Sequence, residues 1–186
     1  MLSSLKQKFF IGATLAVGLA TWSCLNPFAP ALDDGSLTAD LITEQLTPEE
    51  VLTNFKYAYN FRDSLLYAGV LDNEFVFQYF DPEQDASVIF VSWTRETDLR
   101  TTGRLFRTFD SINLEWLNTF NSRLDTLKGD DGEIKSILAS LSQSFQLSLN
   151  SNSFNFSVSG FAIFTMRQSK NDSKWRIVQW VDKSDL

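Results

Sequence analysis

The stretch at residues 144–166, SFQLSLNSNSFNFSVSGFAIFTM, decides which fold class the sequence predicts. Phe145 and Leu147 alternate with polar side chains, and a period of two is typical of a strand with one buried and one wet face. The many Ser and Asn residues share this alternation, so they indicate the wet face of a sheet and not a low-complexity linker. We therefore predict two long strands, at residues 134–149 and 155–168.

Further strands are predicted on both sides of this pair. Runs rich in aromatic and β-branched residues favour strands, and clusters of Gly, Asp, Asn and Ser favour the turns between them. Turns of this kind are expected at residues 128–132 and 169–173. The remaining predicted strands cover residues 74–80, 87–93, 112–120 and 174–181.

The N-terminal part of the domain predicts helices. Thr47 is placed as an N-cap, Pro48 takes the first helical position, and Glu50 completes a capping box. A second short helix is expected at residues 63–71, and a third at residues 98–109 with Asp98 as its N-cap. The first helix has one apolar face, made by Val51, Leu52, Phe55, Ala58 and Tyr59.

Helices followed by antiparallel strands predict a single α+β domain at residues 47–186, with N-terminal helices packed on a curved antiparallel sheet. The element order, with its terminal strand KWRIVQW at residues 174–180, resembles the nuclear-transport-factor-like and cystatin-like superfamily. This resemblance implies a cone-like sheet with a pocket between its concave face and the long helix. It covers about residues 46–183.

The first 23 residues predict a signal peptide. Lys6 and Lys8 precede an apolar run at residues 9–20, which is 12 residues long and shorter than the about 20 that a membrane span needs. Ser23 and Cys24 follow, and Cys24 is the only cysteine of the chain.

The segment around Cys24 resembles the lipobox of bacterial lipoproteins, although Trp22 and Thr21 depart from its usual pattern. The resemblance implies cleavage before Cys24, a lipid on its thiol, and export to the cell envelope, at the outer membrane in a Gram-negative cell. Residues 24–46 would then form a lipidated tether. The alternative is a secreted protein without lipid, because small residues at positions 21 and 23 also suit ordinary signal peptidase.

Composition excludes several classes of function. The chain has 16 Lys and Arg against 23 Asp and Glu, and this acidic balance argues against a nucleic acid partner. It has no histidine, which excludes Ser-His-Asp and Cys-His catalysis and His-ligated metals. We predict neither a cofactor nor a metal site.

One group of residues could line a pocket of the implied cone. A steroid-isomerase-type enzyme of the superfamily would need an Asp base and Tyr donors in an apolar pocket. The alternative is that the two tyrosines pack in the core and the acids serve as a turn residue and a helix cap. The candidates are Tyr67, Asp72, Tyr79, Trp93 and Asp98.

A second group could bind an anion. Arg100, Arg104 and Arg107 are spaced to share one helical face, and Arg95 precedes them. Guanidinium groups are suited to carboxylates and phosphates. The alternative is a solvated helix face paired with local acids such as Glu96.

The sequence therefore predicts a lipid-anchored cell-envelope protein that binds a small molecule or an envelope protein without catalysis. Two alternatives stay open. One is an isomerase- or cyclase-like enzyme with an Asp base, and the other is a structural module that forms a homodimer through its sheet face.

Overall fold

A computed structural model describes residues 41–80 and 90–184 of the chain. The chain divides into two compact units, Met1–Leu37 and Thr38–Leu186, and the described residues all belong to the second unit. Cys24, the predicted signal peptide and most of the predicted tether lie outside the described residues, so these features stay predictions.

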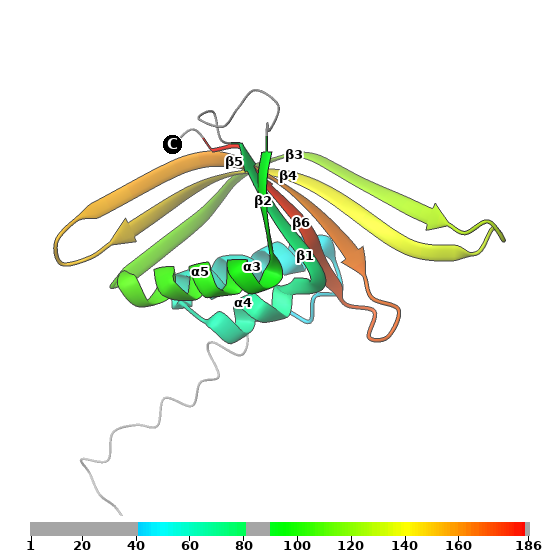
Figure 1. Ribbon diagram of the computed structural model, residues 1–186, viewed down its shortest axis with the longest axis horizontal. Helices are drawn as coiled ribbons and strands as arrows, with labels where there is room; N and C mark the ends of the chain where they lie inside the picture. Colours follow the sequence, from blue (N-terminus) through cyan, green and yellow to red (C-terminus); the bar gives the residue numbers. More distant parts are fainter. Residues whose placement is uncertain (1–40, 81–89, 185–186) are drawn as a thin grey trace, which may run out of the picture. The chain divides into compact units, whose positions relative to one another are not determined.

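The second unit contains one curved sheet of six strands in the order β2-β1-β6-β5-β4-β3 (Figure 1). Neighbouring strands are antiparallel except β1 and β6, which are parallel. The predicted α+β class is confirmed, whereas the one parallel pair departs from the antiparallel sheet that the sequence predicts. The strands are β1 (Leu71–Phe80), β2 (Phe90–Thr94), β3 (Ser111–Lys128), β4 (Ile134–Asn150), β5 (Asn155–Gln168) and β6 (Trp175–Asp182).

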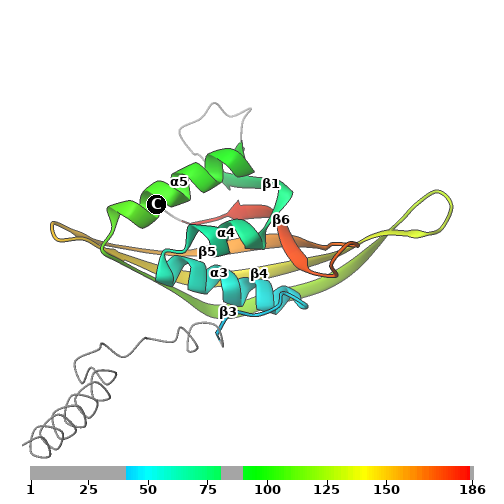
Figure 2. The same ribbon diagram turned by 90° about the horizontal axis from the view of Figure 1, so that it is seen from below.

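Three helices of this unit lie on the concave side of the sheet (Figures 1 and 2). They are α3 (Pro48–Phe61), α4 (Ser64–Val70) and α5 (Arg95–Thr108). Because one face of the sheet arches over the helices, apolar side chains of both layers meet in a single core.

Helix α3 begins as the capping box predicts. The Thr47 hydroxyl accepts a hydrogen bond from the Glu50 amide at 3.2 Å, and the Glu50 carboxylate accepts one from the Leu46 amide at 2.7 Å. The helix ends at Phe61, and its C-cap residue Arg62 has a positive φ of 56°, in the left-handed region. Its predicted apolar face is buried in full.

The segment just before α3 is held against the domain. Gln45 is buried, its carbonyl accepts the Trp175 amide at 2.8 Å, and its side-chain amide donates to the Trp175 carbonyl at 3.0 Å. The Thr43 amide donates to the Asn54 side chain at 2.8 Å. These hydrogen bonds hold the end of the predicted tether against the first turns of α3 and against β6.

Three predicted boundaries are wrong. Strand β1 begins at Leu71, three residues before its predicted start. The strand expected at residues 112–120 continues to Lys128, because pairing with β4 continues although bulges near Thr119 break the alternation of side chains. Helix α5 begins at Arg95 with Thr94 as its N-cap residue, not at Asp98. Asp98 lies one turn into the helix and is buried, so it does not cap it.

Candidate functional site

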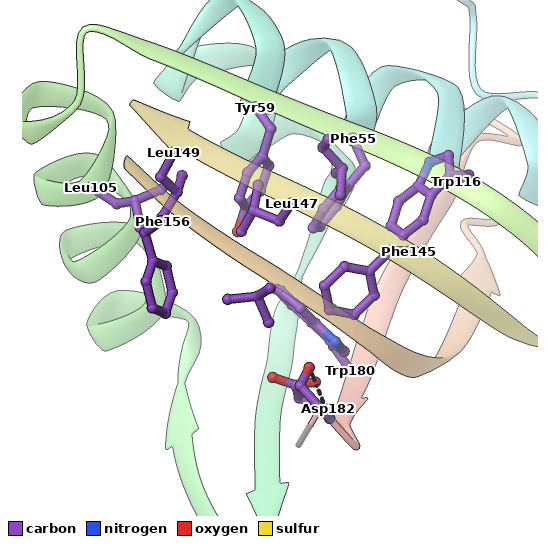
Figure 3. A pocket seen from close by; sticks show the side chains of 13 residues that line it. Phe55, Tyr59, Leu105, Trp116, Phe145, Leu147, Leu149, Phe156, Trp180 and Asp182 are labelled. Carbon is purple, nitrogen blue, oxygen red and sulfur yellow. Dashed lines mark hydrogen bonds between the residues drawn. The ribbon is translucent and has the colours of Figure 1, made fainter. Parts of the chain in front are cut away.

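A cavity of about 230 Å³ lies between the concave face of the sheet and helices α3 and α5. Figure 3 shows the side chains that surround it. They come from two helices, four strands and Ser184, which follows β6. Most of them are apolar, so the cavity offers a ligand mainly van der Waals contacts and removal from water. The apolar lining is made by Phe55, Leu105, Leu114, Trp116, Phe145, Leu147, Leu149, Phe156 and Val158.

Strand register places much of this lining. Leu147 pairs with Val158 and Leu149 with Phe156, and directly opposed residues point to the same face of a sheet. Phe145 pairs with Gly160, where a Cβ atom would lie 2.9 Å from the Phe145 ring. The absence of a side chain at Gly160 therefore leaves room for the Phe145 ring at the cavity wall.

The cavity has few polar groups among the described residues. Asp182 and Ser184 lie at one end, and the Asp182 carboxylate accepts hydrogen bonds from the Ser184 amide at 3.0 Å and from the Ser184 hydroxyl. Trp180 is placed two residues earlier on β6, so it shares the inward face with Asp182. Its indole Nε1 is buried and has no hydrogen-bond partner in the described part of the chain.

Tyr59 supplies the remaining hydroxyl of the lining. Burial raises the pKa of Tyr59 well above its usual range, and the negative charges of Asp98 and Asp182 act in the same direction. Hydrogen bonding with Thr102 and Tyr67 lowers its pKa by less. The Tyr59 side chain is therefore a neutral phenol at physiological pH.

A buried polar cluster lies beside the cavity. The Tyr67 hydroxyl donates to one Asp98 carboxylate oxygen at 2.6 Å, and the Trp93 indole N–H donates to the other at 3.1 Å. Asp98 is 3% exposed, and its burial raises the pKa of this carboxyl, while the hydrogen bonds from Tyr67 and Trp93 act against that rise. Burial also raises the pKa of Tyr67 well above its usual range.

The predicted pocket residues separate into two places, and none of the five lines the cavity. Tyr67, Trp93 and Asp98 meet in the buried cluster, and the Tyr79 ring lies 5.4 Å from that of Trp93. Asp72 lies elsewhere, where it accepts a hydrogen bond from Arg167 at 2.6 Å. Asp98 thus accepts hydrogen bonds from a tyrosine and a tryptophan and does not line this cavity.

Asp72 lines a separate polar cleft of about 580 Å³. Arg167 bridges Asp72 and Glu74 there, and the pairing raises the pKa of its guanidinium. Asp172 and Arg176 form another ion pair in the same cleft, and Arg176 holds the pKa of Asp172 far below its usual range. Acids and arginines balance in number here, so the cleft carries no excess charge for an ionic ligand.

The four predicted anion-binding arginines do not form one group. Arg95 lines the polar cleft and donates to the Ala68 carbonyl at 2.8 Å. Arg100, Arg104 and Arg107 are exposed on α5, and no ion pair holds them within residues 41–80 and 90–184. The anion-binding role of these three residues stays a prediction.

Sequence reasoning missed Trp180 and Asp182 as cavity residues. The spacing of two near the end of the last strand places both on one face, which was a usable signal. What the sequence lacks is any sign that this face points into a cavity.

No protein-family model matches the chain, and no curated protein matches it in sequence. The chain is similar in structure to an aromatic ring hydroxylase, so described, from Novosphingobium aromaticivorans, with 14% identity over 76% of this chain and 89% of that one and a TM-score of 0.53. A conserved protein from Planctomyces limnophilus has 12% identity over 80% and 99% of the two chains and a TM-score of 0.53.

A third similar structure is a protein described as a scytalone dehydratase, also from N. aromaticivorans. It has 10% identity over 82% of this chain and 88% of that one, with a TM-score of 0.51. The fold is nuclear-transport-factor-like. The similarity that the element order predicts is confirmed for the fold.

Two further findings concern the described residues alone. None of the helices within residues 41–80 and 90–184 has the length and hydrophobicity that crossing a membrane requires. In the same ranges, no three Cys, Asp or Glu side chains gather into a set that could hold a metal ion.

Proposed function

We propose that this nuclear-transport-factor-like domain binds a small, mainly apolar molecule in its cavity and acts as a binding module. The observation that carries this proposal is the cavity itself, an apolar space with a few polar groups at defined positions. Its volume of about 230 Å³ lies below the roughly 300–1,000 Å³ of pockets for drug-sized ligands, so the ligand has one or two rings or a short chain.

The position of Asp98 argues against Asp98 as the base of an isomerase-like enzyme. An Asp general base has to reach the proton that it removes, within hydrogen-bond distance or through one water molecule. Asp98 is the described carboxyl whose pKa is raised, but it does not line the cavity and both of its oxygens accept hydrogen bonds. An isomerase-like enzyme would therefore need Asp182, the carboxylate that lines the cavity, as its base, and not Asp98.

A cavity-blocking variant tests the proposal. The probe is naphthylethanol, an apolar bicyclic alcohol, titrated into the domain and followed by calorimetry. Leu147→Trp places a larger side chain on the cavity wall and is expected to weaken binding by at least about tenfold, because it removes the space that the probe would fill. Gln146→Trp, at an exposed position of the same strand, is expected to bind like the wild type.

Two results would contradict the proposal. One is a wild-type domain that binds neither naphthylethanol nor its amine and carboxylate analogues, and the other is equal binding by the two tryptophan variants. Circular dichroism of both variants checks that each is folded, so that loss of binding is assigned to the cavity.

The sequence supports a second part of the proposal, that the protein is exported and carried on a membrane by a lipid at Cys24. We expect the protein extracted from its native membrane to have the mass of residues 24–186 plus glyceryl and acyl groups. Cys24→Ser is expected to lose these groups, because the serine offers no thiol for the lipid. A native protein of bare mature mass in the soluble fraction would contradict the anchor.

A further inference from the structure

The polar end of the cavity is formed by consecutive inward positions of β6 and the residues that follow. Trp180 and Asp182 point inward from the strand, and Ser184 follows them. Asp182 pairs with Ala162 on β5 and with Tyr79 on β1, so its backbone is held on both sides. Its side chain is therefore carried by the centre of the sheet, which is a rigid support for a binding group.

Asp182 is the only charged residue among the described residues that line the cavity. No described Lys or Arg lines the same space, so the charged group at the polar end is a carboxylate. Within a partly closed apolar space, a single charge acts more strongly than it does in water, since less solvent screens it. A ligand with a positive head is attracted there and one with a negative head is repelled.

The hydrogen bonds of Asp182 leave one oxygen available. Both bonds from Ser184 go to the Oδ1 atom, and no described group donates to Oδ2. A carboxylate oxygen accepts hydrogen bonds and cannot donate them when ionised. The complementary ligand group is therefore a donor, and an ammonium group also supplies the opposite charge.

The indole N–H of Trp180 could be thought to favour a carboxylate ligand, since it is a buried donor without a partner. Trp180 and Asp182 are two residues apart on one strand face, so their side chains are neighbours. A carboxylate that reached this N–H would lie close to the Asp182 charge. A neutral oxygen, such as that of an alcohol or of water, satisfies the N–H without that repulsion.

From this geometry we infer that the cavity selects small apolar amines, accepts the corresponding alcohols more weakly, and rejects carboxylates. The inference rests on the proposed ligand-binding function and names the ligand class for the same cavity. Asp182 is the residue that determines this selectivity, through its charge and its free oxygen.

The test compares three ligands that share one apolar body and are substituted at the same ring position. They are naphthylethylamine, naphthylethanol and the carboxylate naphthaleneacetate. Dissociation constants are measured with the full domain by calorimetry at neutral pH. We expect the amine to bind at least about tenfold more tightly than the carboxylate, with the alcohol between them. Asp182→Asn keeps the shape of the side chain and removes its charge, so it is expected to reduce the ratio of amine to carboxylate affinity by about fivefold or more.

Asp130→Asn is the matched control, because it removes the same charge at an exposed position on the β3–β4 turn. It is expected to leave the ratio unchanged, whereas an equal fall in both variants would assign the preference to net charge and overturn the role of Asp182. Equal binding of the three ligands by the wild type, or tightest binding of the carboxylate, would overturn the inference and leave the binding function standing. Binding of none of the three would overturn the proposed function itself. The wild-type ranking decides the inference even where Asp182→Asn does not fold.

Discussion

Replacing Phe55 by alanine is expected to lower the free energy of unfolding by about 3–5 kcal/mol. Phe55 is 1% exposed, and its ring lies 5.0–5.7 Å from five other aromatic rings. These rings come from the helices and from the sheet. The substitution therefore leaves a cavity in the core that no single helix or strand can fill by moving. The five neighbours are Tyr59, Tyr67, Trp116, Phe164 and Trp180.

Urea unfolding followed by circular dichroism measures this loss, and Phe61→Ala is the matched control on the same helix. Phe61 is 47% exposed and stacks on Tyr57 at 5.5 Å. We expect its replacement to cost less than about 1 kcal/mol, because little apolar surface is removed from the core. Equal losses in the two variants would contradict a core centred on Phe55. Since Phe55 also lines the cavity, its replacement is not used to test binding.

Replacing Asp98 by alanine is expected to lower the free energy of unfolding by about 2–4 kcal/mol at neutral pH. The Tyr67 hydroxyl and the Trp93 indole N–H would both lose their acceptor, and an unmet buried donor costs about 1–3 kcal/mol. Removing a desolvated charge offsets part of this cost. The exposed Glu96→Gln on the same helix is the control and is expected to change stability by less than about 0.5 kcal/mol.

Asp98→Asn separates the charge from the hydrogen bonds. Because burial raises the pKa of Asp98, the folded state holds the proton more tightly than the unfolded state does. The contribution of this proton to the free energy of unfolding is fully present below the pKa of Asp98 in the unfolded state, about 3.9. It is lost as the pH rises through the higher pKa of Asp98 in the folded state. The asparagine variant is neutral throughout, so we expect its stability relative to the wild type to increase as the pH rises above about 4.

Unfolding free energies of both proteins at a series of pH values from about 4 to 7 measure this difference. The asparagine oxygen can accept from Trp93, and its amide can donate to the Tyr67 hydroxyl, so the variant is expected to fold. A difference between the two proteins that stays constant with pH would show that the Asp98 carboxyl does not bind its proton more tightly on folding.

The sequence determined those features that depend on neighbours along the chain. The capping box places the start of α3 at Pro48, and its hydrogen bonds join residues only three or four positions apart. Alternation in a strand is likewise a property of adjacent residues, and the bounds of β5 agree with those predicted from it. The α+β class follows from the order of such elements, so it too could be predicted.

Only the tertiary structure decided the parallel pairing of β1 with β6, the role of Asp98 and the identity of the cavity residues. The contact between Tyr67 and Asp98 joins positions 31 residues apart, and the Phe55 ring meets that of Trp180 from the other end of the domain. Asp98 was predicted as a helix cap, and it does not cap α5, because the helix begins one turn earlier and the Asp98 carboxylate is buried in the core. The sequence pattern places Trp180 and Asp182 on one face of a strand. A cavity, however, forms only where side chains from several elements leave space between them. The presence of a cavity therefore cannot be predicted from any single segment of the sequence.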